Sequence, residues 1–202
     1  MTVTAVRMTK RGNIALYVDG EFCMSMHPDV FAASGLSAGM QIDPERLAEL
    51  VGEAQLKKAK EKALHYLSYK EYTASQLKER LLRDVDEESA ALAVGRMEEL
   101  GLVDDGDYAE RFARDLYERK RYGLIRIRQE MRQRGLADEQ IEFAVSLLPD
   151  APLVRIRELI EKKYPLAWED EKVKRRAFAA MLRMGYCAAD VRKALGGRED
   201  YD

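Results

Sequence analysis

Three aspartates surround a glycine in the segment ELGLVDDGDYAERFARDLY, residues 99–117, and clustered carboxylates of this kind could bind Ca²⁺. A calcium loop of the EF-hand type needs oxygen ligands at positions 1, 3 and 5, a glycine at position 6 and a glutamate at position 12. Counted from Asp105, position 5 is Ala109 and position 12 is Leu116, whereas a count from Asp104 reaches a glycine at position 3. Neither register supplies the ligands, so the spacing argues against a calcium site.

The same segment fits a joint between two helices. Gly101 stands where the end of a helix favours a residue in the left-handed conformation. Asp107 and Glu110, three residues apart, have the spacing of an N-cap and a capping box. Apolar side chains then recur at helical spacing, at Tyr108, Phe112 and Leu116. The pattern therefore predicts a helix–turn–helix joint in which Asp107 caps the second helix.

The rest of the chain offers no pattern typical of catalysis or metal binding. His27 and His65 lie far apart, and neither has a cysteine or carboxylate at metal-ligand spacing. Cys23 and Cys187 are too few for a disulfide framework or a zinc cluster. The sequence contains no glycine-rich phosphate loop and no nucleophile elbow. We therefore expect a protein that is not an enzyme, with no catalytic residues, no metal and no cofactor.

Charge is unevenly distributed along the 202 residues, although the net charge is only −2. Residues 84–110 carry ten acidic side chains and one basic, whereas residues 111–134 carry nine basic and three acidic. Such asymmetry can orient a partner, although solvated helix faces would give the same pattern. No apolar run reaches the length of a membrane span, and the N-terminus has no signal-peptide core. We therefore expect a cytoplasmic protein that does not contact membranes.

The first 27 residues alternate apolar and polar positions, as half-buried strands do. Asp19 and Gly20, between the runs NIALYVD and EFCMSMH, are a strong hairpin signal. We predict a three-stranded antiparallel meander followed by a short helix in HPDVFAASGLSAGMQI, together forming a β-rich module over residues 1–50. A meander this small needs a covering element, and the short helix is the candidate.

From Pro44 onward the pattern is nearly all helical, beginning with one long helix. Its predicted apolar stripe consists of Leu47, Leu50, Ala54, Leu64 and Leu67. Beyond it, apolar positions recur every 50 residues, since Leu77 and Leu81 correspond to Ile127 and Met131, and then to Ala177 and Met181. A second set recurs with the same offset, since Gly135, Leu136, Ile141 and Val145 correspond to Gly185, Tyr186, Val191 and Leu195.

Each copy of this repeat contains about three helices. We place three-helix repeats at residues 51–106, 107–150 and 151–202, and expect a mainly α fold with a small N-terminal β-meander. Units of this size pack mainly on their sequence neighbours, which predicts an elongated, curved array. Such an array exposes a long face, which suits an extended partner better than a small substrate.

Several of these motifs resemble the RecX family, regulators of the bacterial recombinase RecA. The most specific matches are GLVDDGDYA at residues 101–109 and GLIRIRQEMRQRGL at residues 123–136. The second family repeat is similar at Gly123, Ile127, Met131, Gly135, Leu136 and Ile141. The first is similar at Thr73, Gln76, Leu77 and Leu81. Where the family usually has an arginine this chain has Tyr72, and residues 151–196 match the third repeat more loosely.

The resemblance implies a non-enzymatic regulator that binds the RecA filament on single-stranded DNA. Such a protein inhibits strand exchange and ATP hydrolysis, and therefore acts in homologous recombination, DNA repair and the SOS response. Direct binding to nucleic acid should be weak, because the acidic block at residues 84–110 opposes it and the net charge is negative, and we expect a monomer. Two other interpretations stay open at this point: a helical DNA-binding module without RecA specificity, and a protein–protein adaptor.

Basic side chains are the candidate contacts to the filament or to DNA. They are Arg114, Arg119, Lys120, Arg121, Arg126, Arg128, Arg132 and Arg134. Arg128 and Arg132, four residues apart, can share one helix face. The family motif also marks joint residues, namely Gly101, Asp104, Asp105, Asp107, Gly123 and Gly135. We expect the aspartates among them to organise the backbone of the joint.

Overall fold

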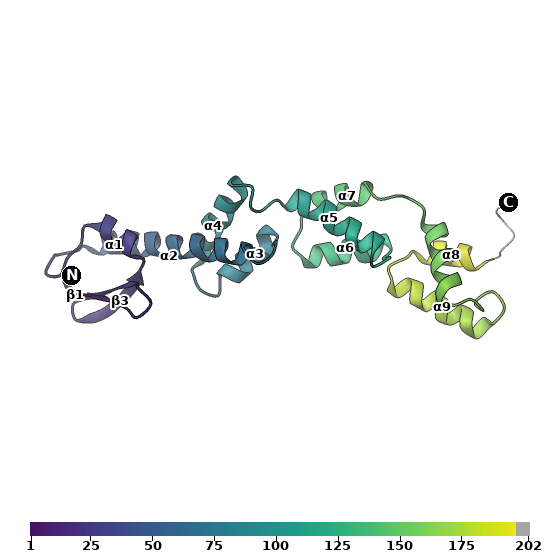
Figure 1. Ribbon diagram of the computed structural model, residues 1–202, viewed down its shortest axis with the longest axis horizontal. Helices are drawn as coiled ribbons and strands as arrows, with labels where there is room; N and C mark the ends of the chain where they lie inside the picture. The colour runs from purple at the N-terminus through teal and green to yellow at the C-terminus, as the bar shows by residue number, and fades with distance from the viewer. Residues whose placement is uncertain (197–202) are drawn as a thin grey trace. The chain divides into compact units, whose positions relative to one another are not determined.

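The computed structural model describes residues 1–196 and contains, over that range, three strands and ten helices. The chain divides after Val103 into two compact units (Figure 1). The fold is mainly α with one small N-terminal sheet, which confirms the predicted mainly α fold class. Among the described residues, no helix combines the length and the apolar character needed to span a lipid bilayer. The last part of the third expected repeat, residues 197–202, lies outside the described residues.

The N-terminal sheet is the predicted antiparallel meander, with the second strand in the centre. Its strands are, in chain order, β1 (Val3–Met8), β2 (Ile14–Val18) and β3 (Glu21–Met26). Asp19 and Gly20 both have positive φ angles, 48° and 88°, as the tight turn of a two-residue hairpin requires. The turn pairs Val18 with Glu21, and a register shift between Leu16 and Tyr17 then pairs Leu16 with Met24. The side chains of Leu16 and Met24 both lie in the core.

Two helices supply the apolar side chains that cover this sheet. They are α1 (Pro28–Ser34) and the first half of α2 (Pro44–Leu67). Phe31 of α1 is partly buried against the core that contains Leu16, and Leu50 of α2 is fully buried in it. The short helix was predicted as the cover, and the structure adds α2 as a second cover.

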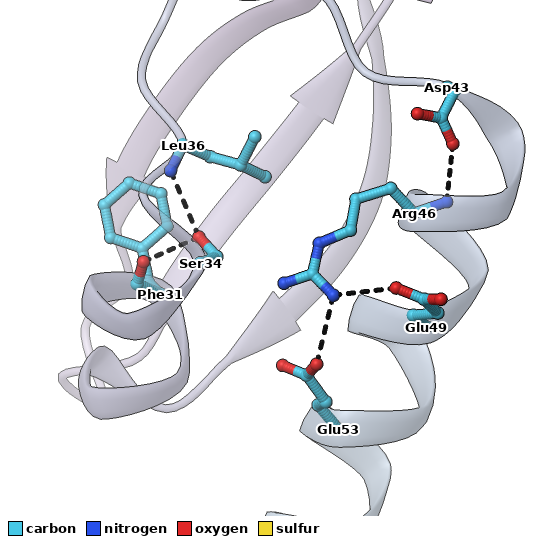
Figure 2. A network of polar contacts seen from close by, with 7 residues as sticks. All are labelled: Phe31, Ser34, Leu36, Asp43, Arg46, Glu49 and Glu53. Carbon is cyan, nitrogen blue, oxygen red and sulfur yellow. Dashed lines mark hydrogen bonds and ion pairs between the residues drawn. The ribbon is translucent and has the colours of Figure 1, made fainter.

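The first turns of α2 are held by side chains close to them in the sequence (Figure 2). Asp43 is the N-cap, and its Oδ1 accepts a hydrogen bond from the backbone N–H of Arg46 at 2.7 Å. The Arg46 guanidinium pairs in turn with Glu49 at 2.9 Å and with Glu53 at 3.2 Å. Pro44 occupies the first helical turn, where its missing N–H removes no hydrogen bond. Local sequence therefore determines where this helix begins, as predicted.

α2 contributes to two separate cores. Leu50 and Ala54 pack against the sheet, whereas Ala59 and Ala63 pack with the helices that follow. The boundary that we placed at residue 50 therefore falls inside a continuous helix. The predicted apolar stripe is wrong at Leu64, which is 48% exposed. Ala59 and Ala63 share this core with Ala90 and Ala93 of the helix Glu87–Glu99, and small side chains allow the two helices a close approach.

The first repeat is completed by α3 (Ala74–Leu81) and α4 (Glu87–Glu99). Thr73 caps α3, because its hydroxyl accepts a hydrogen bond from the N–H of Gln76 at 3.2 Å. The turn between α3 and α4 is tied to α2 by an ion pair of 2.8 Å between Asp84 and Lys62. The hydrogen bond from Lys62 holds the pKa of Asp84 below its usual value.

The second unit contains two further three-helix repeats. Their helices are α5 (Asp105–Glu118), α6 (Leu124–Gln133), α7 (Asp138–Ser146), α8 (Pro152–Lys163), α9 (Glu171–Arg183) and α10 (Ala188–Leu195). The 50-residue register is confirmed in the cores, where all six equivalent side chains are fully buried: Leu77, Leu81, Ile127, Met131, Ala177 and Met181. Gly135 and Gly185 occupy equivalent turns after α6 and α9, and both have positive φ angles, 75° and 87°.

Candidate functional site

The aspartates at the start of the second unit stabilise α5, but the capping residue differs from the prediction. Asp104 is the N-cap, and its Oδ1 accepts a hydrogen bond from the N–H of Asp107 at 2.9 Å. The prediction that Asp107 caps the helix is therefore wrong. The helix already begins at Asp105 and includes Gly106. A glycine disturbs a helix less in the first turn than in the interior, because the first N–H groups of a helix have no intrahelical partners.

The other joint residues also have structural roles. Gly101 has a φ of 66° directly after α4, as predicted for the end of that helix. Asp107 forms an exposed ion pair of 3.0 Å with Arg111, one turn further along α5. Asp105 adds a second acidic side chain to the first turn, where negative charge complements the positive end of the helix dipole. Within residues 1–196, no three acidic, histidine or cysteine side chains gather in a geometry that could hold a metal ion.

The Asp104→Ala substitution should therefore destabilise the protein more than Asp107→Ala does. Loss of the N-cap hydrogen bond should lower the free energy of unfolding by about 0.5–2 kcal/mol. Loss of the exposed pair with Arg111 should lower it by only about 0.3–0.5 kcal/mol. Urea denaturation followed by circular dichroism measures both values. A larger loss for Asp107→Ala would contradict the assignment of Asp104 as the cap.

Three of the eight candidate cations lie at the C-terminal end of α5 and are exposed. Arg119 pairs with Asp115 at 3.1 Å, although its own side chain is 82% exposed. Arg114 and Lys120 form no ion pair with any of the described residues. These three side chains are therefore available to an anionic partner at little energetic loss, because exposed pairs contribute little to stability.

Four other candidate arginines, on and just after α6, are engaged inside the second unit. Arg128 donates two hydrogen bonds to Glu142 of α7, at 2.7 and 2.8 Å. This bidentate pair lowers the pKa of Glu142 and raises that of Arg128. Arg132 pairs with Asp138 at 2.9 Å. The remaining two contacts run from Arg134 to the hydroxyl of Tyr108 at 2.5 Å and from Arg126 to Glu130 at 3.3 Å.

The second and third repeats meet along a seam of direct backbone contact. The N–H of Gly123, the N-cap of α6, donates to the carbonyl of Met184 at 2.8 Å, and the N–H of Ile125 donates to the carbonyl of Gly185 at 3.2 Å. A Cβ added at Gly123 would lie 2.3 Å from the carbonyl oxygen of Gly185. A Cβ added at Gly185 would lie 2.3 Å from Cβ of Arg126. Both positions therefore require glycine for the two repeats to touch.

Side chains on either side of the seam reinforce this contact. Arg126 donates to the carbonyl of Arg183 at 3.1 Å and stacks over the ring of Tyr122, 3.9 Å from its centre. Tyr186 donates to the carbonyl of Arg121 at 3.0 Å. Burial raises the pKa of the Tyr186 phenol. Arg121, the eighth candidate cation, pairs with Glu158 of α8 at 3.8 Å and adopts a positive φ of 56°.

A buried arginine completes the junction. Arg155 of α8 is only 9% exposed and lies over the ring of Tyr117 of α5, 3.4 Å from its centre. Its Nη2 donates to the carbonyl of Tyr117 at 2.6 Å, whereas its Nε has no hydrogen-bond partner among the described residues. The hydroxyl of Tyr117 donates to the carbonyl of Pro149 at 2.9 Å. This group links α5, the α7–α8 connection and α8.

A cavity of about 220 Å³ lies beside the seam. Its lining is mostly apolar and aromatic, and also includes Arg155, Asp150 and Asp190. This volume is smaller than the roughly 300–1,000 Å³ of ordinary small-molecule sites. The second and third repeats therefore join through a packed structural junction, and their accessible chemistry lies in exposed charged side chains.

Two family models match the chain, and both describe three-helix domains of RecX. The model of the first three-helix domain matches residues 59–97, and that of the second matches residues 104–145. A regulatory protein RecX from Caldanaerobacter subterraneus subsp. tengcongensis is 29% identical over 193 residues, which cover 94% of this chain and 95% of that relative. The chain belongs to the RecX family. The predicted resemblance is thereby confirmed, and the matched ranges correspond to the helices from the second half of α2 to α4 and from α5 to α7.

Further RecX proteins agree with this assignment. The regulatory protein RecX of Levilactobacillus brevis is 29% identical over 147 residues, and the match covers 72% of this chain but only 55% of that relative. A crystal structure of regulatory protein RecX has a TM-score of 0.66 at 22% identity, covering 96% of this chain and 98% of the other. A crystal structure of RecX from Lactobacillus salivarius has a TM-score of 0.62 at 21% identity, covering 70% and 95%. At these identities the structures show a shared RecX fold.

Several residues of the RecX repeat junction were not among the predicted site residues. Gly185 stood out only as the repeat equivalent of Gly135, although its contact with Gly123 gives both residues their importance. Arg155 and Tyr117 carry no periodic or motif signal, because their contact joins two repeats through residues that are far apart in sequence. The 50-residue offset was the one signal that could have added Gly185 to the predicted site residues, as the repeat equivalent of Gly135.

Proposed function

We propose that this RecX protein is a non-enzymatic regulator that binds the RecA filament on single-stranded DNA and mostly inhibits its recombinase and ATPase activities. The observation that carries this proposal is the match to both RecX three-helix domains, in chain order. RecA is the partner implied by the family resemblance. On this proposal the protein acts as a monomer in the cytoplasm, in DNA repair by homologous recombination and in the SOS response.

The charge distribution supports an extended, partly anionic partner. Exposed cations at the end of α5 can approach DNA phosphates, because Arg114 and Lys120 have no competing ion pair among the described residues. Acidic side chains dominate residues 84–110 and would repel naked DNA. A partner made of both protein and DNA can satisfy both kinds of surface, whereas DNA alone cannot. The proposal therefore includes only weak direct binding to nucleic acid.

A test is ATP hydrolysis by RecA on single-stranded DNA, measured with and without this protein. We expect hydrolysis to slow as the protein is added, because the protein bound to the filament would inhibit the ATPase activity of RecA. An unrelated ATPase that also depends on single-stranded DNA is the control, and its rate should not change. Slowing of both enzymes would favour the alternative of a DNA-binding module that competes for the strand. Unchanged RecA activity at several-fold excess of the protein would overturn the proposal.

A further inference from the structure

Basic side chains outnumber acidic ones in the third repeat. Residues 151–196 carry eleven Lys or Arg side chains against six Asp or Glu, so this repeat is net positive. In the second repeat, at least six of the nine basic side chains form ion pairs within the unit. Along α9 and α10, within the described residues, a single ion pair is formed, between Arg175 and Glu171 at 3.4 Å. Both of its side chains are largely exposed, so the pair restrains Arg175 only weakly.

Some of these cations line an open groove between α9 and α10, with a volume of about 330 Å³. Glu171, Lys174, Arg175 and Phe178 line it from α9, where spacings of three and four residues place side chains on one face. Arg192 and Leu195 line it from α10. The Arg192 guanidinium lies 5.8 Å from the centre of the Phe178 ring, so that positive charge and an aromatic surface adjoin.

Phe178 is anchored in a way that suits a stacking surface. Its side chain is half-buried and packs against the core of the third repeat, which includes Met181 and Val191. The ring is therefore held in place while part of it faces the groove. Sites for single-stranded nucleic acid combine a positively charged groove with such aromatic surfaces, because every base has a flat face that can stack.

We propose that the α9–α10 groove binds single-stranded nucleic acid, with phosphates against Lys174, Arg175 and Arg192 and a base against Phe178. This inference rests on the proposed function and adds a contact to the DNA strand besides the exposed cations at the end of α5. An acidic peptide would satisfy the cations but would leave the aromatic ring unused. The combination of three cations with one ring therefore favours a nucleic acid.

The experiment measures binding of the full chain to a fluorescent oligothymidylate of about twenty nucleotides by anisotropy, over a range of salt concentrations. The test variant combines Lys174→Ala, Arg175→Ala and Arg192→Ala. Each phosphate contact on a single strand contributes about −0.7 to the slope of log affinity against log salt, so the variant should flatten the slope by up to about 2. Phe178→Leu keeps an apolar side chain on the core but removes the ring, and should weaken binding about fivefold or more.

A matched control variant combines Lys162→Ala, Lys163→Ala and Arg176→Ala. It removes the same charge from the same repeat, but none of its residues lines the groove. The control should keep most of the wild-type salt slope. Equal losses in the two triple variants would mean that net charge alone attracts the DNA, and would overturn the groove assignment. Unchanged binding by Phe178→Leu would overturn the stacking contact. Binding of a polyglutamate peptide but not of the oligonucleotide would also overturn the proposal.

The RecA assay separates failure of this inference from failure of the proposed function. If the wild-type protein slows RecA but the groove variant binds the oligonucleotide normally, the groove assignment fails and the proposed function stands. If oligonucleotide binding depends on the groove but RecA is unaffected, the groove assignment stands and the proposed function fails. Circular dichroism of each variant checks that the helical repeats stay folded.

Discussion

Gly123→Ala should open the seam between the second and third repeats while both three-helix cores stay folded. The added Cβ would lie 2.3 Å from the carbonyl oxygen of Gly185, closer than non-bonded carbon and oxygen atoms can approach. Both partners are backbone, so neither can rotate away as a side chain could. The φ of Gly123 is −77°, which alanine adopts readily, so the expected effect comes from the contact alone.

Amide hydrogen exchange measures the opening of this seam. The amides of residues 123 and 125 donate across it, to Met184 and Gly185. Two lost hydrogen bonds, each contributing about 0.5–1.5 kcal/mol, should speed exchange at these two amides roughly tenfold to a hundredfold. Helix content measured by circular dichroism should change little, because the core residues Ile127 and Met181 lie within single repeats.

Gly101→Ala is the matched control for this experiment. Gly101 has a positive φ of 66°, but an added Cβ there would meet no atom within 4 Å. The substitution should therefore lower stability by about 1–2 kcal/mol through backbone strain, without changing exchange at residues 123 and 125. Normal exchange at these two amides in Gly123→Ala would show that the seam is not closed in solution.

Binding to RecA-coated DNA should depend more on Arg114, Arg119 and Lys120 than on the four arginines of the α6 region. If these three exposed cations face phosphates, changing all three to alanine should flatten the slope of log affinity against log salt concentration by up to about 2. Between 50 and 200 mM salt, that difference corresponds to roughly fifteenfold to twentyfold in affinity. Co-sedimentation with filaments over a salt series measures it.

The comparison variant changes Arg126, Arg128, Arg132 and Arg134 to alanine. Four phosphate contacts would flatten the slope by at most about 3, but all four side chains already have partners within the second unit. We therefore expect a smaller change in slope, accompanied by a lower denaturation midpoint because α6 loses its bonds to α7 and to the third repeat. A slope change near 3 with unchanged stability would contradict the expectation that these four arginines contribute less to binding than the exposed cations of α5.

The same salt series also measures whether the protein prefers the filament to naked DNA. Wild-type protein should bind RecA-coated DNA more tightly than naked DNA, because protein contacts add to phosphate contacts. Equal affinity for both would favour a plain DNA-binding module. Binding without salt dependence, unaffected by either set of substitutions, would favour a protein–protein adaptor, in which these cations are solvated helix surface.

The sequence by itself determined the features that depend on neighbouring residues. The hairpin at Asp19 and Gly20, the cap at Asp43 and the cap at Thr73 each involve groups within a few positions of one another. The 50-residue repeat was equally readable, because the same side chains must fill the same core positions in each copy. Together these signals were enough for the fold class and, with the motifs around residues 101–136, for the family.

Only the tertiary structure decided which groups are available for binding. Arg128 and Arg114 look alike in the sequence, yet one is held by Glu142 across two helices and the other is exposed. The contact between Gly123 and Gly185 joins residues sixty-two positions apart, and the local sequence around neither glycine predicts it. Phe178 and Arg192 likewise form one groove only because α9 and α10 pack together. The sequence gives the charge and aromatic character of each side chain, but the packing of the helices determines which side chains lie next to one another.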